Sequence, residues 1–268
     1  MKFINISAYK FVAVQDPAAW QPLFKEKADA LSLKGTILIS PEGVNLFLAA
    51  PKEIIDEYLD WLRVNFLGDD FGRQAVIGHS DHQPFGKMVV RLTREIITMR
   101  HPTIKPSDGR APFVSPTQLR QWLDKGVDDQ GREVVLLDTR NDFEVKIGTF
   151  EGAKEFDIEK FSQFPDALKK SLKEQQESYK DKTIVSFCTG GIRCEKAVLY
   201  MQELEIPHVY QLDGGILRYF EEVGGAHWQG ECFVFDERVA VDPQLKETKI
   251  DYEGRTKKSA GANNYGQT

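Results

Sequence analysis

The sequence predicts two domains of different class, an N-terminal α+β sandwich and a C-terminal α/β domain with a parallel sheet. The first prediction rests on the order strand, helix, strand, strand, helix, strand over the first hundred residues. The second rests on strands and helices that alternate after residue 113, a pattern typical of parallel sheets covered by helices. With 268 residues, 41% of them hydrophobic, the chain is long enough to build two cores.

The elements of the first domain follow from local patterns. Asp16 and Pro17 supply an N-cap and a first-turn proline for the first helix. Apolar residues at helical spacing between Ile54 and Phe66 predict the second helix. Their order is that of a ferredoxin-like sandwich, predicted for residues 1–100. The predicted strands cover residues 3–14, 35–40, 44–50, 74–77 and 88–98.

Residues 101–112 hold three prolines and one glycine without hydrophobic periodicity, which predicts a linker. The second domain is predicted at residues 113–223 and begins with a helix capped by Ser115 and Pro116. Its predicted strands are 133–138, 183–187 and 208–212, and its later helical stretches are 167–179, 195–204 and 216–222. A C-terminal extension is predicted at residues 224–268, with a polar end that is predicted to be disordered.

A cysteine follows the strand at residues 183–187 directly and precedes a helix. Gly190 and Gly191 allow the intervening loop to turn several N–H groups toward one point. The helix N-terminus and Arg193 add positive potential, so Cys188 is predicted to be a low-pKa nucleophile. The alternative is a cysteine that only packs in a core, and it leaves the glycines and the arginine unexplained.

The loop Cys188-Thr-Gly-Gly-Ile-Arg193 resembles the active-site loop of rhodaneses, in which four residues separate a cysteine from an arginine. Cysteine phosphatases use a loop one residue longer. The adjoining Cys194-Glu-Lys-Ala197 and the downstream stretch 228–236 resemble bacterial rhodanese-domain proteins that hydroxylate the wobble uridine of tRNA. This resemblance covers nearly the whole chain and implies a rhodanese-like second domain. It assigns the active-site loop to Cys188, Thr189, Gly190, Gly191, Ile192, Arg193 and Cys194.

The resemblance also implies an activity, the oxygen-dependent conversion of the wobble uridine to 5-hydroxyuridine. Molecular oxygen is then a co-substrate, an unidentified reductant is needed, and no further cofactor is evident. The expected partner is the anticodon loop of tRNA. Asp138 and Arg140 resemble the first rhodanese signature, whose residues support the cysteine loop. As a hypothesis, the Cys188 thiolate adds to C6 of uridine and turns C5 into an enolate-like carbon.

Two other classes of function stay open at this point. A thiosulfate-type sulfurtransferase would use the same loop through a Cys188 persulfide, but it has no evident use for the first domain. A non-catalytic RNA-binding or scaffold protein would leave the environment of the cysteine unexplained. Cys194 is expected to pack in the core, because a disulfide to Cys188 would distort the loop. The alternative is that it resolves an oxidised Cys188.

The net charge of −6 argues against nucleic acid, but its distribution is uneven. Seven Lys or Arg residues against three acidic ones give residues 71–110 a charge of +4, which leaves −10 elsewhere. This segment is either a phosphate-binding patch or a solvated strand face. The aromatic strand motif of RNA-recognition modules is missing, so phosphate contacts are expected. The candidate RNA contacts are Lys87, Arg91, Arg94 and Arg100.

The sequence offers weak metal signals and no membrane signal. His79, Asp81 and His82 match an iron-ligand pattern, but they are predicted to lie in a polar turn before Pro84, so no metal is expected. Three cysteines without paired spacing argue against zinc and for a reducing compartment. No apolar run is long enough to span a membrane, and the N-terminus lacks a secretory pattern. A cytoplasmic protein without an evident protein partner is expected.

Overall fold

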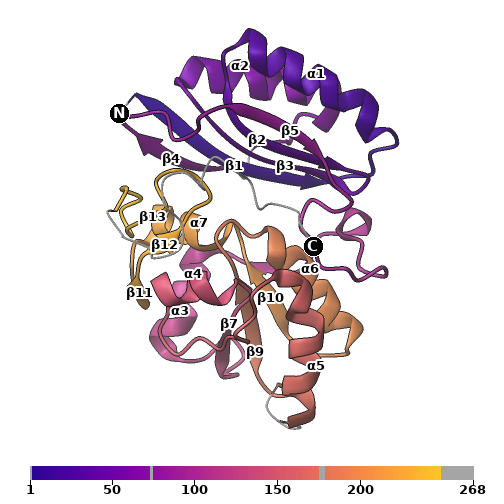
Figure 1. The fold of residues 1–268 in the computed structure, drawn as a ribbon. Coiled ribbons are helices and arrows are strands. Elements are labelled where there is room, and N and C mark those ends of the chain that lie inside the picture. Colours follow the sequence, from indigo (N-terminus) through magenta and orange to yellow (C-terminus); the bar gives the residue numbers. More distant parts are fainter. Residues whose placement is uncertain (1, 73–74, 175–178, 249–268) are drawn as a thin grey trace. The chain divides into compact units, whose positions relative to one another are not determined.

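The computed structural model describes residues 2–72, 75–174 and 179–248. These residues form two compact units (Figure 1). Among the described residues, the first unit comprises 2–72, 75–96, Val234–Val241 and 245–248. The second unit comprises Ile97–Phe233 and Asp242–Gln244. The first unit therefore includes a segment that follows the second unit in sequence.

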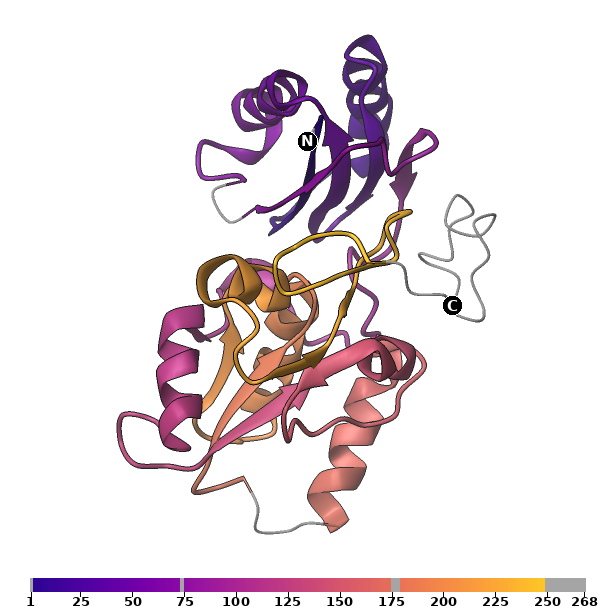
Figure 2. The ribbon, with the colours of Figure 1, turned by 90° about the vertical axis from the view of Figure 1, so that its left-hand side faces the viewer.

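The first unit is the predicted α+β sandwich. Its five-stranded sheet has the order β4-β1-β3-β2-β5, in which the first four strands have the ferredoxin-like order and β5 is added parallel to β2. Two helices cover one face of this sheet (Figures 1 and 2). The elements are β1 (Phe3–Phe11), α1 (Pro17–Ala30), β2 (Lys34–Ser40), β3 (Gly43–Ala50), α2 (Lys52–Leu62), a π-helical turn (Arg63–Leu67), β4 (Val76–Ser80), β5 (Met88–Leu92) and β13 (Ala240–Val241).

α1 begins at the capping residues that the sequence predicted. The Asp16 carboxylate accepts the N–H of Ala19 at 3.1 Å, and Pro17 is the first helical residue. The core between sheet and helices centres on buried Phe24 and Tyr58. The Tyr58 hydroxyl donates to the carbonyl of Phe24 at 3.1 Å, which satisfies the polar atom of this buried ring.

The strand predicted at residues 74–77 is displaced in the structure. Residue 74 lies outside the described residues, and β4 runs from Val76 to Ser80 because β1 continues to pair with it, with Ile4 opposite His79. The prediction that His79 lies in a turn was therefore wrong. Strand pairing with β1 overrides the polar character of this segment.

The second unit contains the predicted parallel sheet, with the order β6-β10-β9-β7 and parallel pairing throughout. The later helical prediction 167–179 corresponds to a helix that begins at Phe164. The elements are a 3₁₀ turn (Pro106–Asp108), β6 (Phe113–Val114), α3 (Pro116–Lys125), β7 (Val134–Asp138), α4 (Asp142–Ile147), β8 (Gly148–Phe150), a 3₁₀ turn (Phe161–Gln163), α5 (Phe164–Glu174), β9 (Thr183–Phe187), α6 (Ile192–Glu203), β10 (Val209–Leu212), α7 (Gly215–Val223), β11 (Trp228–Gly230) and β12 (Cys232–Phe233).

Helices cover both faces of this parallel sheet. Core residues of α5 and α6 pack with Ile184 and Val209 on one face. On the other face, Trp122 of α3 meets Tyr210 edge to face. Phe187 contacts Phe150, which in turn contacts Tyr219 of α7. Burial on both faces explains why β9 contains only apolar residues and small hydroxyl residues. Because the strands are parallel, β9 ends at the carboxyl edge of the sheet, where α/β folds place their sites.

Candidate active site

The loop that joins β9 to α6 wraps around the sulfur of Cys188. The N–H of Gly191 donates to Cys188 Sγ at 3.1 Å. Gly191 has φ +92°, a left-handed conformation that glycine adopts without strain, and it is the N-cap of α6. Cys188 is 0% exposed, a depth of burial that the sequence pattern did not predict.

The surroundings of Cys188 favour its thiolate. Burial alone opposes ionisation, but a hydrogen bond from Cys194 and the charge and N–H groups of Arg193 outweigh it and lower the pKa of Cys188 to about 6. The pKa of Cys194 is raised instead, because burial and the neighbouring Cys188 both oppose a second thiolate. At neutral pH the pair therefore carries one negative charge, on Cys188.

Arg193 is held by Glu144, a residue of α4 that the sequence did not identify as a site residue. Arg193 Nη1 lies 2.5 Å from Glu144 Oε2, and Nη2 lies 2.9 Å from Oε1. The hydroxyl of Thr189 donates to Oε1 at 3.2 Å. Glu144 is fully buried, which raises its pKa, but the charge and hydrogen bonds of Arg193, together with the Arg140 charge and the backbone N–H of Asn141, outweigh burial and lower the pKa. Its place four residues after Arg140, close to the pair that resembles the first rhodanese signature, was the available signal.

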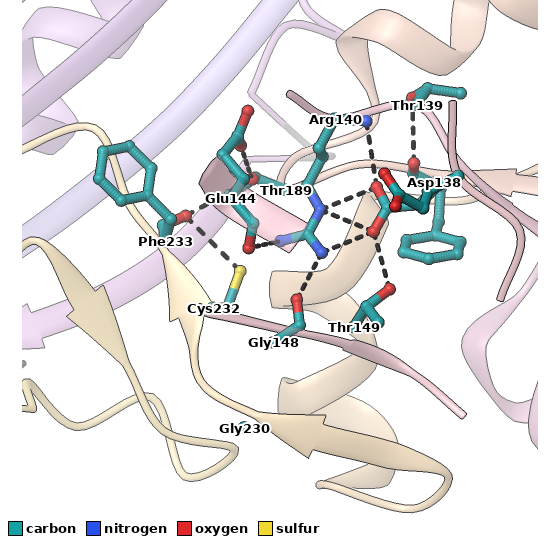
Figure 3. A network of polar contacts seen from close by, with 12 residues as sticks. Asp138, Thr139, Arg140, Glu144, Gly148, Thr149, Thr189, Gly230, Cys232 and Phe233 are labelled. Atoms are coloured by element: carbon teal, nitrogen blue, oxygen red, sulfur yellow. Dashed lines mark hydrogen bonds and ion pairs between the residues drawn. The ribbon is translucent and has the colours of Figure 1, made fainter. Parts of the chain in front are cut away.

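Asp138 and Arg140 form a buried ion pair next to Glu144 (Figure 3). Arg140 Nε donates to Asp138 Oδ1 at 2.9 Å, and Nη2 donates to Oδ2 at 2.6 Å and to the Gly148 carbonyl at 2.6 Å. Nη1 donates to the backbone carbonyl of Glu144 at 3.4 Å. Both residues thus fix the backbone that carries Glu144. They support the cysteine loop indirectly, because Glu144 in turn binds Arg193.

The N-terminus of α7 holds the other side of the loop. The N–H groups of Ile216 and Leu217 donate to the carbonyls of Cys188 and Thr189 at 3.0 and 3.1 Å. Gly215 precedes them with φ +66°, and a Cβ atom there would lie 2.3 Å from the Cys188 carbonyl oxygen. Only glycine permits this approach, so Gly215 is a second residue of the loop's support that the sequence did not identify.

Gly215→Ala is expected to unfold or displace the cysteine loop. Gly126→Ala is a matched control, because Gly126 also has a left-handed φ of +74°, but no atom lies within 4 Å of the place that an added Cβ would occupy. The control should cost about 1–2 kcal/mol from the left-handed backbone alone. Gly215→Ala should cost clearly more and reduce activity at least about tenfold, since a 1 Å displacement of reacting groups has such effects. Equal unfolding free energies and equal activities would contradict this account.

The candidate RNA contacts lie on both units. Lys87 and Arg94 are exposed and Arg91 is half-buried on β5, all in the first unit, whereas the exposed Arg100 belongs to the second. Their contact with RNA stays a prediction. In residues 2–72, 75–174 and 179–248, no group of three or more His, Cys, Asp or Glu side chains has the geometry to hold a metal ion. No helix within these ranges is long and apolar enough to cross a membrane.

Comparison with known proteins agrees with this architecture. Residues 3–96 match the model of the UPF0176 acylphosphatase like domain, and residues 115–222 match that of the rhodanese-like domain. A Cupriavidus necator protein named tRNA uridine(34) hydroxylase is 54% identical over 92% of this chain and 85% of its own length. The chain belongs to the tRNA uridine(34) hydroxylase family. Relatives of the same name from Paraburkholderia phytofirmans and Ralstonia nicotianae are each 53% identical, over 93% and 91% of this chain and over 86% and 85% of their own lengths. The predicted resemblance, the two-domain fold class and membership of an enzyme family are thereby confirmed.

Proposed function

We propose that this protein hydroxylates uridine 34 of tRNA at C5, with molecular oxygen as co-substrate. The observation that carries this proposal is the conjunction of 54% identity to a named tRNA uridine(34) hydroxylase with a buried thiolate in a rhodanese-like loop. A nucleophile that adds to C6 activates C5 of the pyrimidine ring, and Cys188 is the thiolate that the second unit provides.

The chemistry can begin with addition of the Cys188 thiolate to C6 of the uracil ring. C5 then becomes an enolate-like carbon that can react with oxygen. The Gly191 N–H, 3.1 Å from the sulfur, and the charge of Arg193 stabilise the thiolate before addition and after its release. Glu144 fixes the guanidinium of Arg193 through two hydrogen bonds, so the charge needs no reorganisation during the reaction.

The substrate is proposed to bind through its anticodon loop, in which position 34 is single-stranded. An unpaired base can enter an active site without opening a duplex. The exposed Lys87 and Arg94 of the first unit are proposed to contact phosphates of the same tRNA, together with Arg91 and Arg100. A tRNA substrate implies that the protein works in the cytoplasm.

Purified protein with unmodified tRNA under ¹⁸O₂ tests the proposal. We expect 5-hydroxyuridine at position 34 that carries ¹⁸O, detected by mass spectrometry of the nucleosides. Transfer of ¹⁸O only from labelled water would contradict an oxygen-dependent reaction. A rhodanese-like loop can also hold a persulfide, so thiosulfate:cyanide sulfurtransferase turnover should be measured in parallel. Fast sulfur transfer combined with unmodified tRNA would favour the sulfurtransferase alternative.

The reactivity of Cys188 is expected to depend on pH with a midpoint near 6. Iodoacetamide reacts with the thiolate, so alkylation of Cys188 should rise as the pH passes through about 6 and then level off. Burial raises the pKa of Cys232 to about 12, so alkylation of this internal control should still rise in the alkaline range, where Cys188 has levelled off. Peptide mass spectrometry separates the two sites. A Cys188 rate that keeps increasing up to the ordinary thiol pKa of 9.0 would show an ordinary thiol.

The same shift has a consequence for stability. The pKa of Cys188 is lower in the folded protein than its ordinary value of 9.0, so the thiolate stabilises the fold. That contribution is fully present above pH 9.0 and is lost as the pH falls through about 6.

A further inference from the structure

We propose that Cys188 and Cys194 act as a redox pair, in which Cys194 resolves an oxidised Cys188 and the two thiols supply the two electrons that hydroxylation consumes. This inference rests on the proposed hydroxylase function and identifies the reductant that acts inside the site.

Cys188 and Cys194 stand at the two ends of one short loop. The loop folds back, so that their sulfur atoms lie next to each other. Cys194 is the third residue of α6, and its N–H donates to the Gly191 carbonyl at 3.0 Å. Its fully buried thiol is hydrogen-bonded to the Cys188 sulfur and lies 3.6 Å from Thr139 Oγ1. Thr139 Oγ1 donates at 3.0 Å to the carbonyl of Phe187, the residue before Cys188. The Thr139 side chain therefore contacts both Cys194 and the residue that precedes the nucleophile.

The two thiols differ in protonation state, as a nucleophile and a resolving thiol must. Cys188 is the thiolate at neutral pH, whereas Cys194 keeps its proton because burial and then the adjacent anion raise its pKa. Once Cys188 is oxidised, its negative charge is gone and one of the two causes that hold the proton on Cys194 disappears. Cys194 thus becomes more nucleophilic only after Cys188 has been oxidised.

The steps balance in atoms and electrons. Addition of Cys188 to C6 and of O₂ to C5, followed by loss of the C5 proton and release of the thiolate, gives 5-hydroperoxyuridine. The released Cys188 thiolate takes the distal oxygen atom, which with one proton gives 5-hydroxyuridine and Cys188 sulfenic acid. Cys194 then attacks this sulfur and water leaves. One uridine, one O₂ and two thiols become one hydroxyuridine, one water and one disulfide.

Closing the disulfide brings the sulfurs to about 2.05 Å and must move the loop. Gly190 and Gly191 lie between the two cysteines and tolerate such a change of backbone angles. In the oxidised loop no thiolate remains for the Gly191 N–H to stabilise, because both sulfurs are bound in the disulfide. The enzyme should therefore stop after one turnover until an external thiol reduces it.

Single-turnover experiments test the redox pair. Full-length protein is reduced, freed of reductant without air, mixed with excess unmodified tRNA and then exposed to oxygen. We expect one hydroxyuridine and the loss of two thiols per chain, with a Cys188–Cys194 disulfide in the peptide map and Cys232 still free. Cys194→Ser retains a hydrogen-bond donor but cannot form the disulfide. It should give one hydroxyuridine, leave Cys188 as a sulfenic acid that dimedone traps, and turn over again with dithiothreitol.

The outcomes separate the two proposals. Hydroxyuridine formed while all three thiols remain free, or repeated turnover without any added reductant, overturns the redox pair and leaves the hydroxylase function standing. A Cys194→Ser variant without trapped sulfenic acid overturns it as well. Unmodified tRNA from the wild-type protein, even with dithiothreitol and oxygen, overturns the hydroxylase function itself and the redox pair with it.

Discussion

Replacing Cys188 by alanine is expected to abolish hydroxylation of uridine 34, with a loss of at least about 10³-fold, because the variant lacks the thiolate proposed to form the bond to C6. The measurement is nucleoside analysis of tRNA from a strain whose only copy of the protein carries Cys188→Ala. Cys188→Ser is the matched variant, since it keeps a hydroxyl at the same place but not a thiolate. It should be equally inactive. Undiminished 5-hydroxyuridine derivatives in either strain would contradict the cysteine mechanism.

Below about pH 6, where the stabilising contribution of the Cys188 thiolate is lost, the same substitution should have only a modest effect on folding. The Cys188 thiol is fully buried, so its removal leaves a small cavity and costs about 1 kcal/mol, the size typical of point substitutions. Denaturant unfolding of the purified variant checks this value. A variant that is inactive but folded assigns the loss to chemistry, whereas a cost of several kcal/mol would mean that the thiolate also organises the loop.

Glu144→Ala is expected to have the largest effect on stability. It leaves the guanidinium of Arg193, which is 4% exposed, without its carboxylate partner in the interior. Breaking one side of a buried ion pair costs about 3–5 kcal/mol. The Arg193 charge and the Thr189 hydroxyl both lose their anchor, so the purified variant should also be inactive.

Two further variants separate charge from position. Glu133→Ala removes an exposed carboxylate that pairs with Lys182 at 2.9 Å, and it should cost less than about 1 kcal/mol. Glu144→Ala with Arg193→Met removes both buried charges, so it should recover part of the lost stability but none of the activity. A Glu144→Ala variant that unfolds like Glu133→Ala, or that hydroxylates tRNA normally, would show that the buried pair does not hold the loop.

The sequence by itself determined the two fold classes and singled out Cys188 as the candidate nucleophile. Hydrophobic periodicity and capping residues such as Asp16 and Ser115 are local signals, and the helices begin where these residues stand. The Cys188 loop could be found because its strand, glycines and arginine are contiguous in sequence. A resemblance to rhodanese-domain hydroxylases could be read from the same contiguous motifs and from the stretch at 228–236.

Only the tertiary structure decided which residues support that loop and how deeply the thiol lies. Glu144 and Gly215 stand 44 and 27 residues away from Cys188 in sequence, and their contacts exist because parallel strands end at one edge of the sheet. The exposure of Cys188 depends on every element packed around it, so no local pattern could give it. His79 likewise lies in a strand because β1 pairs with it, a contact across 75 residues. Such contacts follow from packing, which the one-dimensional pattern does not contain.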